Sequence, residues 1–408
     1  MKQSGIDWIG EIPDDWKIIR LKHIFQIKKD IAGKEGFTVL SVTQTGIRPK
    51  DMSSKGQFAL DYSKYQLVNS GEFIMNHMDL KTGWIDISKY NGVTSPDYRV
   101  FYLTDKNCVK DYYKQIFQYC YKNLIFFSLG QGVADLGRWR LPAEMFNNFK
   151  LPLPPKATQQ RIAEYLDSKC AQIDSIIEES KKSIEEYKAW KQSVIFEAVT
   201  GKNLNCKKKD SGIEWIGEVP DVWTCTKLKY YIQIKSGDAI RNEELTDLGL
   251  YQVFGGGECI GMTNLHNADS SNILIGRVGA RCGCITKPND KVWATDNALI
   301  VSSNMNRDFL TYCLQAVNLN ELNNSNAQPL ITGTKVKNTF IPIPDNPEQK
   351  KIVTYLDSKC AQIDSLIAEK ESLITDLTEY KKSLIFEVVT GKRGCRHNLP
   401  LYREDFSK

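Results

Sequence analysis

The segment RIAEYLDSKCAQIDSIIEESKKSIEEYKAWKQSVIFEAVTGK at 161–202 recurs as KIVTYLDSKCAQIDSLIAEKESLITDLTEYKKSLIFEVVTGK at 351–392, with 24 of 42 positions identical. In both copies, large apolar residues follow one another by three or four residues or by combinations of these steps, which is the pattern of a coiled-coil helix. These residues are Ile162, Leu166, Ile173, Ile177, Ile184, Tyr187 and Val194 in the first copy, and Ile352, Leu356, Ile363, Ile367, Ile374, Leu377 and Leu384 in the second. The pattern predicts two long helices.

Residues that stop a helix lie on both sides of each copy. Proline cannot extend a helix backwards, and glycine is favoured just past its end. The stops are LPLPP at 151–155 with Gly201, and IPIPDNP at 341–347 with Gly391. We therefore expect spacer helices at 156–202 and 346–392.

A second repeat precedes each helical repeat. The opening segment SGIDWIGEIPDDWKIIRLKHIFQIK at 4–28 recurs as SGIEWIGEVPDVWTCTKLKYYIQIK at 211–235, with 15 of 25 positions identical. The opening segments are 207 residues apart, whereas the helical segments are 190 residues apart. The first insert between them, about 29–155, is therefore 17 residues longer than the second, about 236–345. The repeated segments are alike, whereas the inserts between them differ. This pattern indicates that the two halves perform one task on two different targets.

Two copies of one helix in a single chain predict a pseudo-two-fold axis. A two-fold contact is self-complementary, so we expect the helices to pack antiparallel, with one insert at each end. The alternative is a coil that serves only for dimerisation.

The inserts have the pattern of β-rich α/β modules. Short strands are expected within 71–103 and 271–303, each set followed by an amphipathic helix, at 111–127 and 307–324. The expected fold class is α+β, with two α/β domains joined by two long antiparallel coiled-coil helices. The expected parts are domain 1 (1–155), the first helix (156–202), a linker (203–210), domain 2 (211–345), the second helix (346–392) and a C-terminal tail (393–408).

Composition indicates a globular protein of the cytoplasm. Hydrophobic residues make up 41% and charged residues 25%, and no apolar run reaches the ~18 residues of a membrane span. The start lacks the apolar core of a signal peptide. The 11 cysteines form no C-x-x-C pair, so we expect reduced thiols and no zinc site. The net charge of +5 permits a polyanionic partner without requiring one.

The sequence contains few of the motifs that mark a catalytic site. The chain has no G-x-x-x-x-G-K-[ST] loop and no Asn-Pro-Pro-aromatic tetrapeptide, and its four histidines lack metal-ligand spacing. A nuclease could pair Asp97 with Glu186 and Lys188, but that second pair lies on the predicted coil, where charges normally face water. We expect no catalytic residues and no metal site.

DNA reading is favoured by loops that carry Arg or Lys beside Gly and small polar residues, because bidentate Arg on guanine is the commonest specific contact. The second insert offers 276–281 and a second basic loop at 332–337. We regard 78–83 and 130–140 of the first insert as their counterparts. A surface or salt-bridged role is the alternative for each. The candidates are Lys81, Gln131, Arg138 and Arg140 in the first insert, and Arg277, Arg281, Thr334, Lys335 and Lys337 in the second.

The chain resembles the specificity subunits of type I restriction-modification systems. The resemblance rests on the repeated SGI-x-WIGE-x-P-x-x-W opening, on ILIGRVGA…CG…WATDNAL, and on a proline followed by T-Q or E-Q and then I-x-x-YLD at the start of each helical segment. It implies that each insert is a target recognition domain for one half of a split, asymmetric DNA sequence. It also implies that the helices set the gap between the halves.

The resemblance further implies partners. Two methylation subunits would dock on the helices, and restriction subunits would complete the complex. S-adenosylmethionine, ATP and Mg²⁺ would belong to those partners, so we expect no cofactor on this chain. The candidate docking residues are Arg161, Tyr165, Asp167, Lys351, Tyr355 and Asp357. Thr158-Gln159 replaces the usual Glu-Gln that Glu348-Gln349 keeps, so the two docking surfaces need not be equivalent. The competing hypotheses are a self-sufficient DNA-modifying enzyme and a scaffold without nucleic acid.

Overall fold

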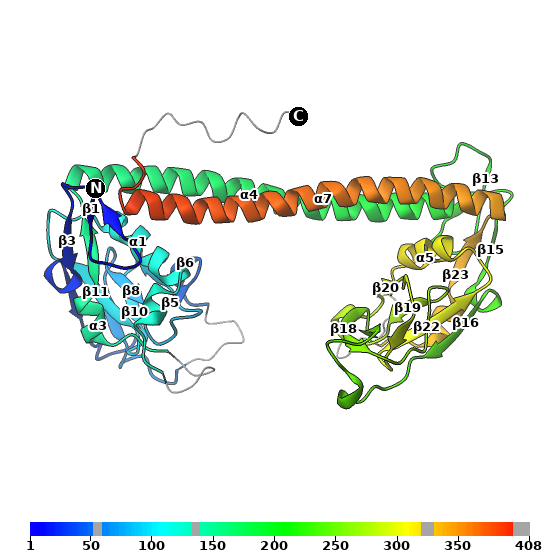
Figure 1. Ribbon diagram of the computed structural model, residues 1–408, viewed down its shortest axis with the longest axis horizontal. Coiled ribbons are helices and arrows are strands. Elements are labelled where there is room, and N and C mark those ends of the chain that lie inside the picture. Colours follow the sequence, from blue (N-terminus) through cyan, green and yellow to red (C-terminus); the bar gives the residue numbers. More distant parts are fainter. Residues whose placement is uncertain (52–58, 133–138, 320–329, 395–408) are drawn as a thin grey trace. The chain divides into compact units, whose positions relative to one another are not determined.

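The structure is a computed structural model that describes residues 1–51, 59–132, 139–319 and 330–394 (Figure 1). The chain divides into two compact units. Unit 1 comprises Met1–Glu179 with Leu373–Lys408, and unit 2 comprises Ser180–Ser372. Helix α4 (Lys156–Thr200) passes from unit 1 into unit 2, and helix α7 (Asn346–Val389) passes back. Each unit therefore combines one domain with parts of both long helices.

Unit 1 is built on a four-stranded antiparallel sheet in the order β4-β11-β8-β9. Aromatic side chains of the sheet pack on helix α1 (Lys110–Lys122), where Phe25, Phe73 and Phe101 surround Phe117 at centroid distances of 5.5, 5.6 and 5.8 Å. The strands of this sheet are β4 (Phe25–Lys28), β11 (Arg99–Leu103), β8 (Phe73–Met75) and β9 (Ile85–Ile87). The described part of the unit also contains four strand pairs. They are β1 (Lys2–Gln3) with β2 (Glu11–Ile12), β3 (Lys17–Arg20) with β12 (Lys150–Leu153), β5 (Leu40–Thr43) with β6 (Gly46–Pro49), and β7 (Gln66–Val68) with β10 (Gly92–Thr94).

Unit 2 repeats this plan with a sheet in the order β16-β22-β19-β20. Its strands are β16 (Ile232–Ser236), β22 (Ala298–Ser303), β19 (Ile273–Gly276) and β20 (Ile285–Thr286). A second sheet in the order β18-β17-β21 contains β18 (Glu258–Thr263), β17 (Tyr251–Gly255) and β21 (Val292–Ala294), and its β17–β21 pair is parallel. The pairs are β13 (Lys208–Asp210) with β14 (Glu218–Pro220), and β15 (Thr224–Lys227) with β23 (Phe340–Ile343).

The two four-stranded sheets share one register. Val100 of β11 pairs with Ile74 and Lys28, and Ile300 of β22 pairs with Leu274 and Lys235. Lys28 and Lys235 are the last residues of the repeated opening segment. Positions in β8 and β11 therefore correspond to positions 200 residues later in β19 and β22. This correspondence allows the unlike inserts to be compared residue by residue.

The domain helices are shorter than expected. Helix α1 ends at Lys122, and a separate helix α2 (Ile125–Ser128) follows Leu124, whose φ of 56° breaks the helix. Helix α5 (Arg307–Ala316) ends two residues before Asn318, whose φ is 50°. A residue in the left-handed region cannot continue a right-handed helix. The apolar pattern predicted the helices but not these stops.

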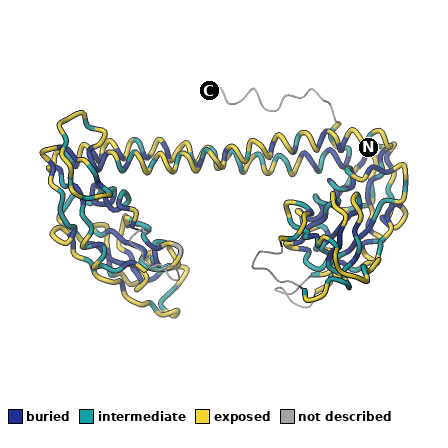
Figure 2. The backbone as a smooth tube through the Cα atoms, turned by 180° about the vertical axis from the view of Figure 1, so that it is seen from behind, coloured by how far each residue is buried: buried dark blue, intermediate teal, exposed yellow. Residues whose placement is uncertain are grey.

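The long helices begin where the sequence predicts, at 156 and 346, but α4 ends at Thr200 and α7 at Val389, two and three residues before the expected ends at 202 and 392. The expected apolar seam is buried or half-buried throughout: Leu166, Ile173, Leu356 and Ile363 are fully buried, and Ile177 and Ile374 are half-buried (Figure 2). Within each unit α4 and α7 run side by side (Figure 1). An ion pair between them is present in each unit, Lys381–Asp174 at 2.6 Å in unit 1 and Lys191–Asp364 at 2.7 Å in unit 2. Among the described helices none is long and apolar enough to cross a membrane.

The two repeated blocks pack on each other, which explains why both are duplicated. Gly201 has a φ of +70°, and a Cβ there would lie 2.6 Å from Pro220 and 3.0 Å from Trp223. Gly391 has a φ of +75° and the same distances to Pro13 and Trp16. Each opening segment therefore covers the C-terminal end of a long helix at a residue where only glycine fits.

Candidate nucleic-acid interface

Arg277 follows strand β19 and is held across the edge of the sheet. Its Nη1 donates to Ser236 Oγ at 2.9 Å and more weakly to the Asp296 carbonyl at 3.5 Å. The side chain is half-buried, and its Nε is buried without a partner among the described residues. The guanidinium is therefore fixed in orientation at the end of two strands, where it can present its remaining donors.

Arg281 ends a short 3₁₀ turn, Gly279–Arg281, that starts at a glycine with a φ of 72°. Its Nη2 lies 2.6 Å from Glu258 Oε1, and both side chains are about half exposed, at 53% and 55%. In this structure Arg281 therefore has the salt-bridged role that was the alternative to a DNA contact. Exposed ion pairs contribute only ~0–1 kcal/mol, so this one can be exchanged for a contact with DNA at little cost.

The second basic loop is a helix, which corrects the sequence prediction. Thr332 caps helix α6 (Gly333–Asn338) by accepting the Lys335 amide at 3.4 Å, a bond that favours a helix start over a loop. Thr334 is exposed, whereas Lys335 and Lys337 are half-buried. The bridge between Val278 and Leu330 and the bond from Ile331 N to Arg277 O (2.9 Å) hold this segment beside the Arg277 loop.

In unit 1 the structure brings Gln131 and Arg140 together. Their backbones form a bridge with bonds of 2.9 and 3.0 Å. Both residues line a pocket of about 730 Å³ together with His77 and Arg99. Arg138 lies outside the described residues. Lys81 is not among the residues that line this pocket, and its Nζ lies 5.3 Å from the centre of the Phe127 ring.

The register shows which of these positions correspond. Lys81 lies at the place of Arg281 and His77 at the place of Arg277, and the carbonyls of His77 and Arg277 accept equivalent bonds, from Leu141 N and Ile331 N, both at 2.9 Å. The counterpart of α6 is helix α3 (Ala143–Asn148). Residues 332–337 therefore match 142–147 and not 130–140, contrary to our expectation.

Sequence reasoning missed Arg99, at the first position of β11. Its side chain is 5% exposed, its Nη2 donates to the Leu141 carbonyl at 2.9 Å, and its guanidinium carbon lies 4.8 Å from the Phe146 ring centre. In domain 2 the equivalent residue is Leu299, which is buried in the core. An arginine at a core position of a strand was the available signal, but the register is needed to recognise it.

The predicted docking residues have different roles in the structure. Arg161 and Lys351 are exposed, and Tyr355 is 41% exposed, whereas its counterpart Tyr165 is buried at 4%. Arg393, which follows α7, has its guanidinium carbon 5.9 Å from the centre of the Tyr380 ring. The two surfaces therefore differ.

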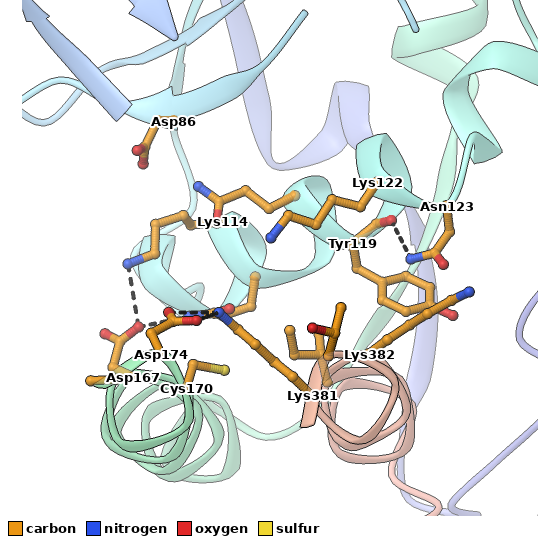
Figure 3. Close-up of a pocket in the computed structure, with 15 residues that line it drawn as sticks. Asp86, Lys114, Tyr119, Lys122, Asn123, Asp167, Cys170, Asp174, Lys381 and Lys382 are labelled. Atoms are coloured by element: carbon orange, nitrogen blue, oxygen red, sulfur yellow. Dashed lines mark hydrogen bonds and ion pairs between the residues drawn. The ribbon is translucent and has the colours of Figure 1, made fainter. Parts of the chain in front are cut away.

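The two aspartates bind the domains of this chain. Asp167 accepts from Gln115 Nε2 at 2.6 Å and lies 3.4 Å from Lys114 Nζ, at the edge of a cavity of about 490 Å³ in which Lys381 also reaches Asp174 (Figure 3). In unit 2 the equivalent carboxylate, Asp357, accepts from the Tyr312 hydroxyl at 2.6 Å. Both aspartates hold a domain helix against a long helix.

The start of each long helix depends on a buried glutamine. Gln159 accepts from Val109 N at 2.8 Å and donates to the Pro154 carbonyl at 2.8 Å, and Gln349 donates to the Pro344 carbonyl at 3.0 Å. Glu348 accepts from the Trp223 indole at 2.7 Å. The first helix has Thr158 at the place of Glu348. The contact that Glu348 makes with the second opening segment therefore cannot be made in the same way to the first.

Comparisons with known proteins agree with this architecture. The chain is 24% identical over 427 residues to the type I restriction enzyme MjaVIII specificity subunit of Methanocaldococcus jannaschii, covering 93% of each chain. It is 30% identical over 136 residues to the EcoprrI specificity subunit of Escherichia coli, covering 33% and 32%.

Solved structures share the fold. A chain of a type I R-M system superposes with a TM-score of 0.72 at 14% identity, covering 94% of this chain and all of that one. The HsdS subunit from Thermoanaerobacter tengcongensis superposes with a TM-score of 0.54 at 16% identity, covering 96% and 100%. The family model for the type I restriction modification DNA specificity domain matches twice, at residues 13–186 and 220–375, and the chain belongs to that family.

Proposed function

We propose that this chain is the DNA-reading specificity subunit of a type I restriction-modification complex and that each domain reads one half of a bipartite target. The observation that carries the proposal is the shared register with different groups at matched places. Domain 1 has His77 and Arg99 where domain 2 has Arg277 and Leu299. One scaffold with different donors is what reading two different half-sites requires.

The partners supply the chemistry in this proposal. Two methylation subunits dock on the long helices beside the exposed Arg161, Lys351 and Tyr355, and the restriction subunits complete the complex. S-adenosylmethionine, ATP and Mg²⁺ bind to those subunits. The helices of this chain set the gap between the half-sites.

The test is an exchange of domain 2 for the equivalent insert of another family member, expressed with the methylation subunits. Sequencing of methylated DNA should show one new half-site and one unchanged half-site. A simultaneous change of both would contradict independent reading. Methylation by the chain alone would favour a self-sufficient enzyme, and absence of salt-dependent DNA binding by the complex would favour a scaffold.

A further inference from the structure

The pocket of domain 1 has a positively charged floor. His77, Arg99, Gln131 and Arg140 line it, and among the described residues that line it there is no acidic side chain. Arg99 is the most buried of these four, at 5% exposure, whereas Arg140 and Gln131 are exposed at the rim. The pocket therefore offers donors at two depths and a local excess of positive charge.

Among the described residues, Arg99 has partners for only some of its hydrogen-bond donors. Its Nη2 is bound to the Leu141 carbonyl, but its Nη1 is buried without a hydrogen-bond partner among the described residues. Burial lowers the pKa of Arg99 to about 10, so the guanidinium remains charged at neutral pH. Burial and the neighbouring Arg99 and Arg140 lower the pKa of His77 to about 4, so His77 is neutral there, and its Nδ1 is also buried without a described partner.

A buried charge without a counter-ion destabilises a fold, and hydrophobic groups of similar size often replace such charges without loss. Domain 2 has that replacement, because Leu299 occupies the equivalent position and packs in the core. The scaffold thus does not need an arginine here. A cost to stability at one position of one domain points to a ligand of that domain.

We infer that the domain 1 pocket receives a hydrogen-bond acceptor of the DNA, with Arg99 as the donor at its floor and Arg140 and Gln131 as donors at its rim. The inference rests on the proposed function and adds a specificity-determining residue to it. The acceptor is either the O6/N7 edge of a guanine or a phosphate oxygen, since both bind a guanidinium fork. Domain 2, with Leu299, has no equivalent contact.

The test is the Arg99→Leu variant, which installs the domain 2 residue, assembled with the methylation subunits. The probe is duplex DNA containing both half-sites, as identified by methylome sequencing. We expect a melting temperature equal to or above that of the wild type and an affinity lower by about 5- to 150-fold. The Arg20→Leu variant is the control, because it removes the same charge from an exposed position at the end of β3.

Two sets of modified DNA identify the acceptor. If the acceptor is a guanine, replacing one guanine of the domain 1 half-site by 7-deazaguanine weakens the wild type and leaves Arg99→Leu unchanged. If the acceptor is a phosphate, replacing one phosphate by a methylphosphonate weakens the wild type and leaves Arg99→Leu unchanged. The slope of log affinity against log salt is then smaller by about one in Arg99→Leu than in the wild type.

Wild-type affinity of folded Arg99→Leu would overturn the inference, and so would a lower melting temperature with a normal response to every modified DNA. If Arg99→Leu fails to fold, Arg99→Lys decides: it keeps the charge but loses the fork, so weaker binding supports the inference and unchanged binding overturns it. A wild-type complex without sequence preference would instead refute the proposed function.

Discussion

The long helices allow the gap between half-sites to be lengthened by design. The two equivalent ion pairs, Asp174–Lys381 and Asp364–Lys191, place the midpoint of the repeat after Lys182 in α4 and after Ser372 in α7. Four residues inserted at both points lengthen both helices equally and preserve the ion pairs on either side. Such an insertion is a stutter, which a coiled coil absorbs by local unwinding.

The expected magnitude follows from helix and DNA geometry. Four residues add ~6 Å and ~400° of helix, a net rotation of ~40°. For helices that run along the DNA axis, one base pair adds ~3.4 Å and ~35°. Two base pairs would match the length better but require ~70°. Because rotation determines which groove faces a domain, we expect the preferred gap to grow by one base pair with both half-sites unchanged.

A seven-residue insertion is the matched control. It preserves the heptad seam and adds ~10.5 Å, close to three base pairs, but rotates by only about −20° where three base pairs require ~100°. We expect it to lose most of its activity. The assay is methylation of a DNA library with fixed half-sites and gaps that vary one base pair at a time. If a folded, partner-bound four-residue variant kept the wild-type gap preference, the proposal that the helices set the gap would be refuted.

Three further predictions concern single side chains. Arg277→Ala should weaken binding by ~1–3 kcal/mol in a DNA titration, and unchanged affinity with an unchanged salt slope would remove it from the interface. Glu348→Ala should lower the free energy of unfolding by ~1–3 kcal/mol in urea, because it leaves the Trp223 indole without its acceptor, whereas Thr158→Ala should change it by less than ~0.5 kcal/mol. Burial and two nearby arginines lower the pKa of His77 from 6.5 to about 4. The contribution of neutral His77 to the free energy of unfolding is therefore complete above pH 6.5 and is lost as the pH falls towards 4, by at most ~1.4 kcal/mol per pH unit. The same acid dependence of stability in His77→Asn would contradict this.

The architecture could be predicted from the sequence because its signals are local. Prolines, glycines and a seam of apolar residues determine where α4 and α7 begin and end, and neighbouring residues suffice to recognise them. The stops at Leu124 and Asn318 depend on backbone conformations that apolar periodicity does not report. The same holds for α6, where a single capping threonine, Thr332, turns a basic loop into a helix.

The site was only partly predictable because it depends on strand register. Glycine-rich loops predict Arg277, Arg281 and Lys81 as DNA contacts, which stays a prediction, and the register places Lys81 and Arg281 at matched positions. Arg99 was missed, because only the pairing of β11 with β8 shows that it occupies a core position and faces a pocket. The conformation of a loop can often be inferred from its own residues, whereas a buried charge is defined by its neighbours in space.

The aspartates of the long helices show how one frame can hold two unlike domains. Asp167 and Asp357 are equivalent in the repeat, yet the first accepts from an amide, Gln115, and the second from a phenol, Tyr312. The frame supplies a fixed acceptor, and each insert supplies its own donor at the same position of its first helix. An insert from another family member should therefore dock if that position carries a donor of suitable reach, whatever its DNA-reading loops contain. Separation of the docking position from the reading positions is what lets the target sequence change without a new scaffold.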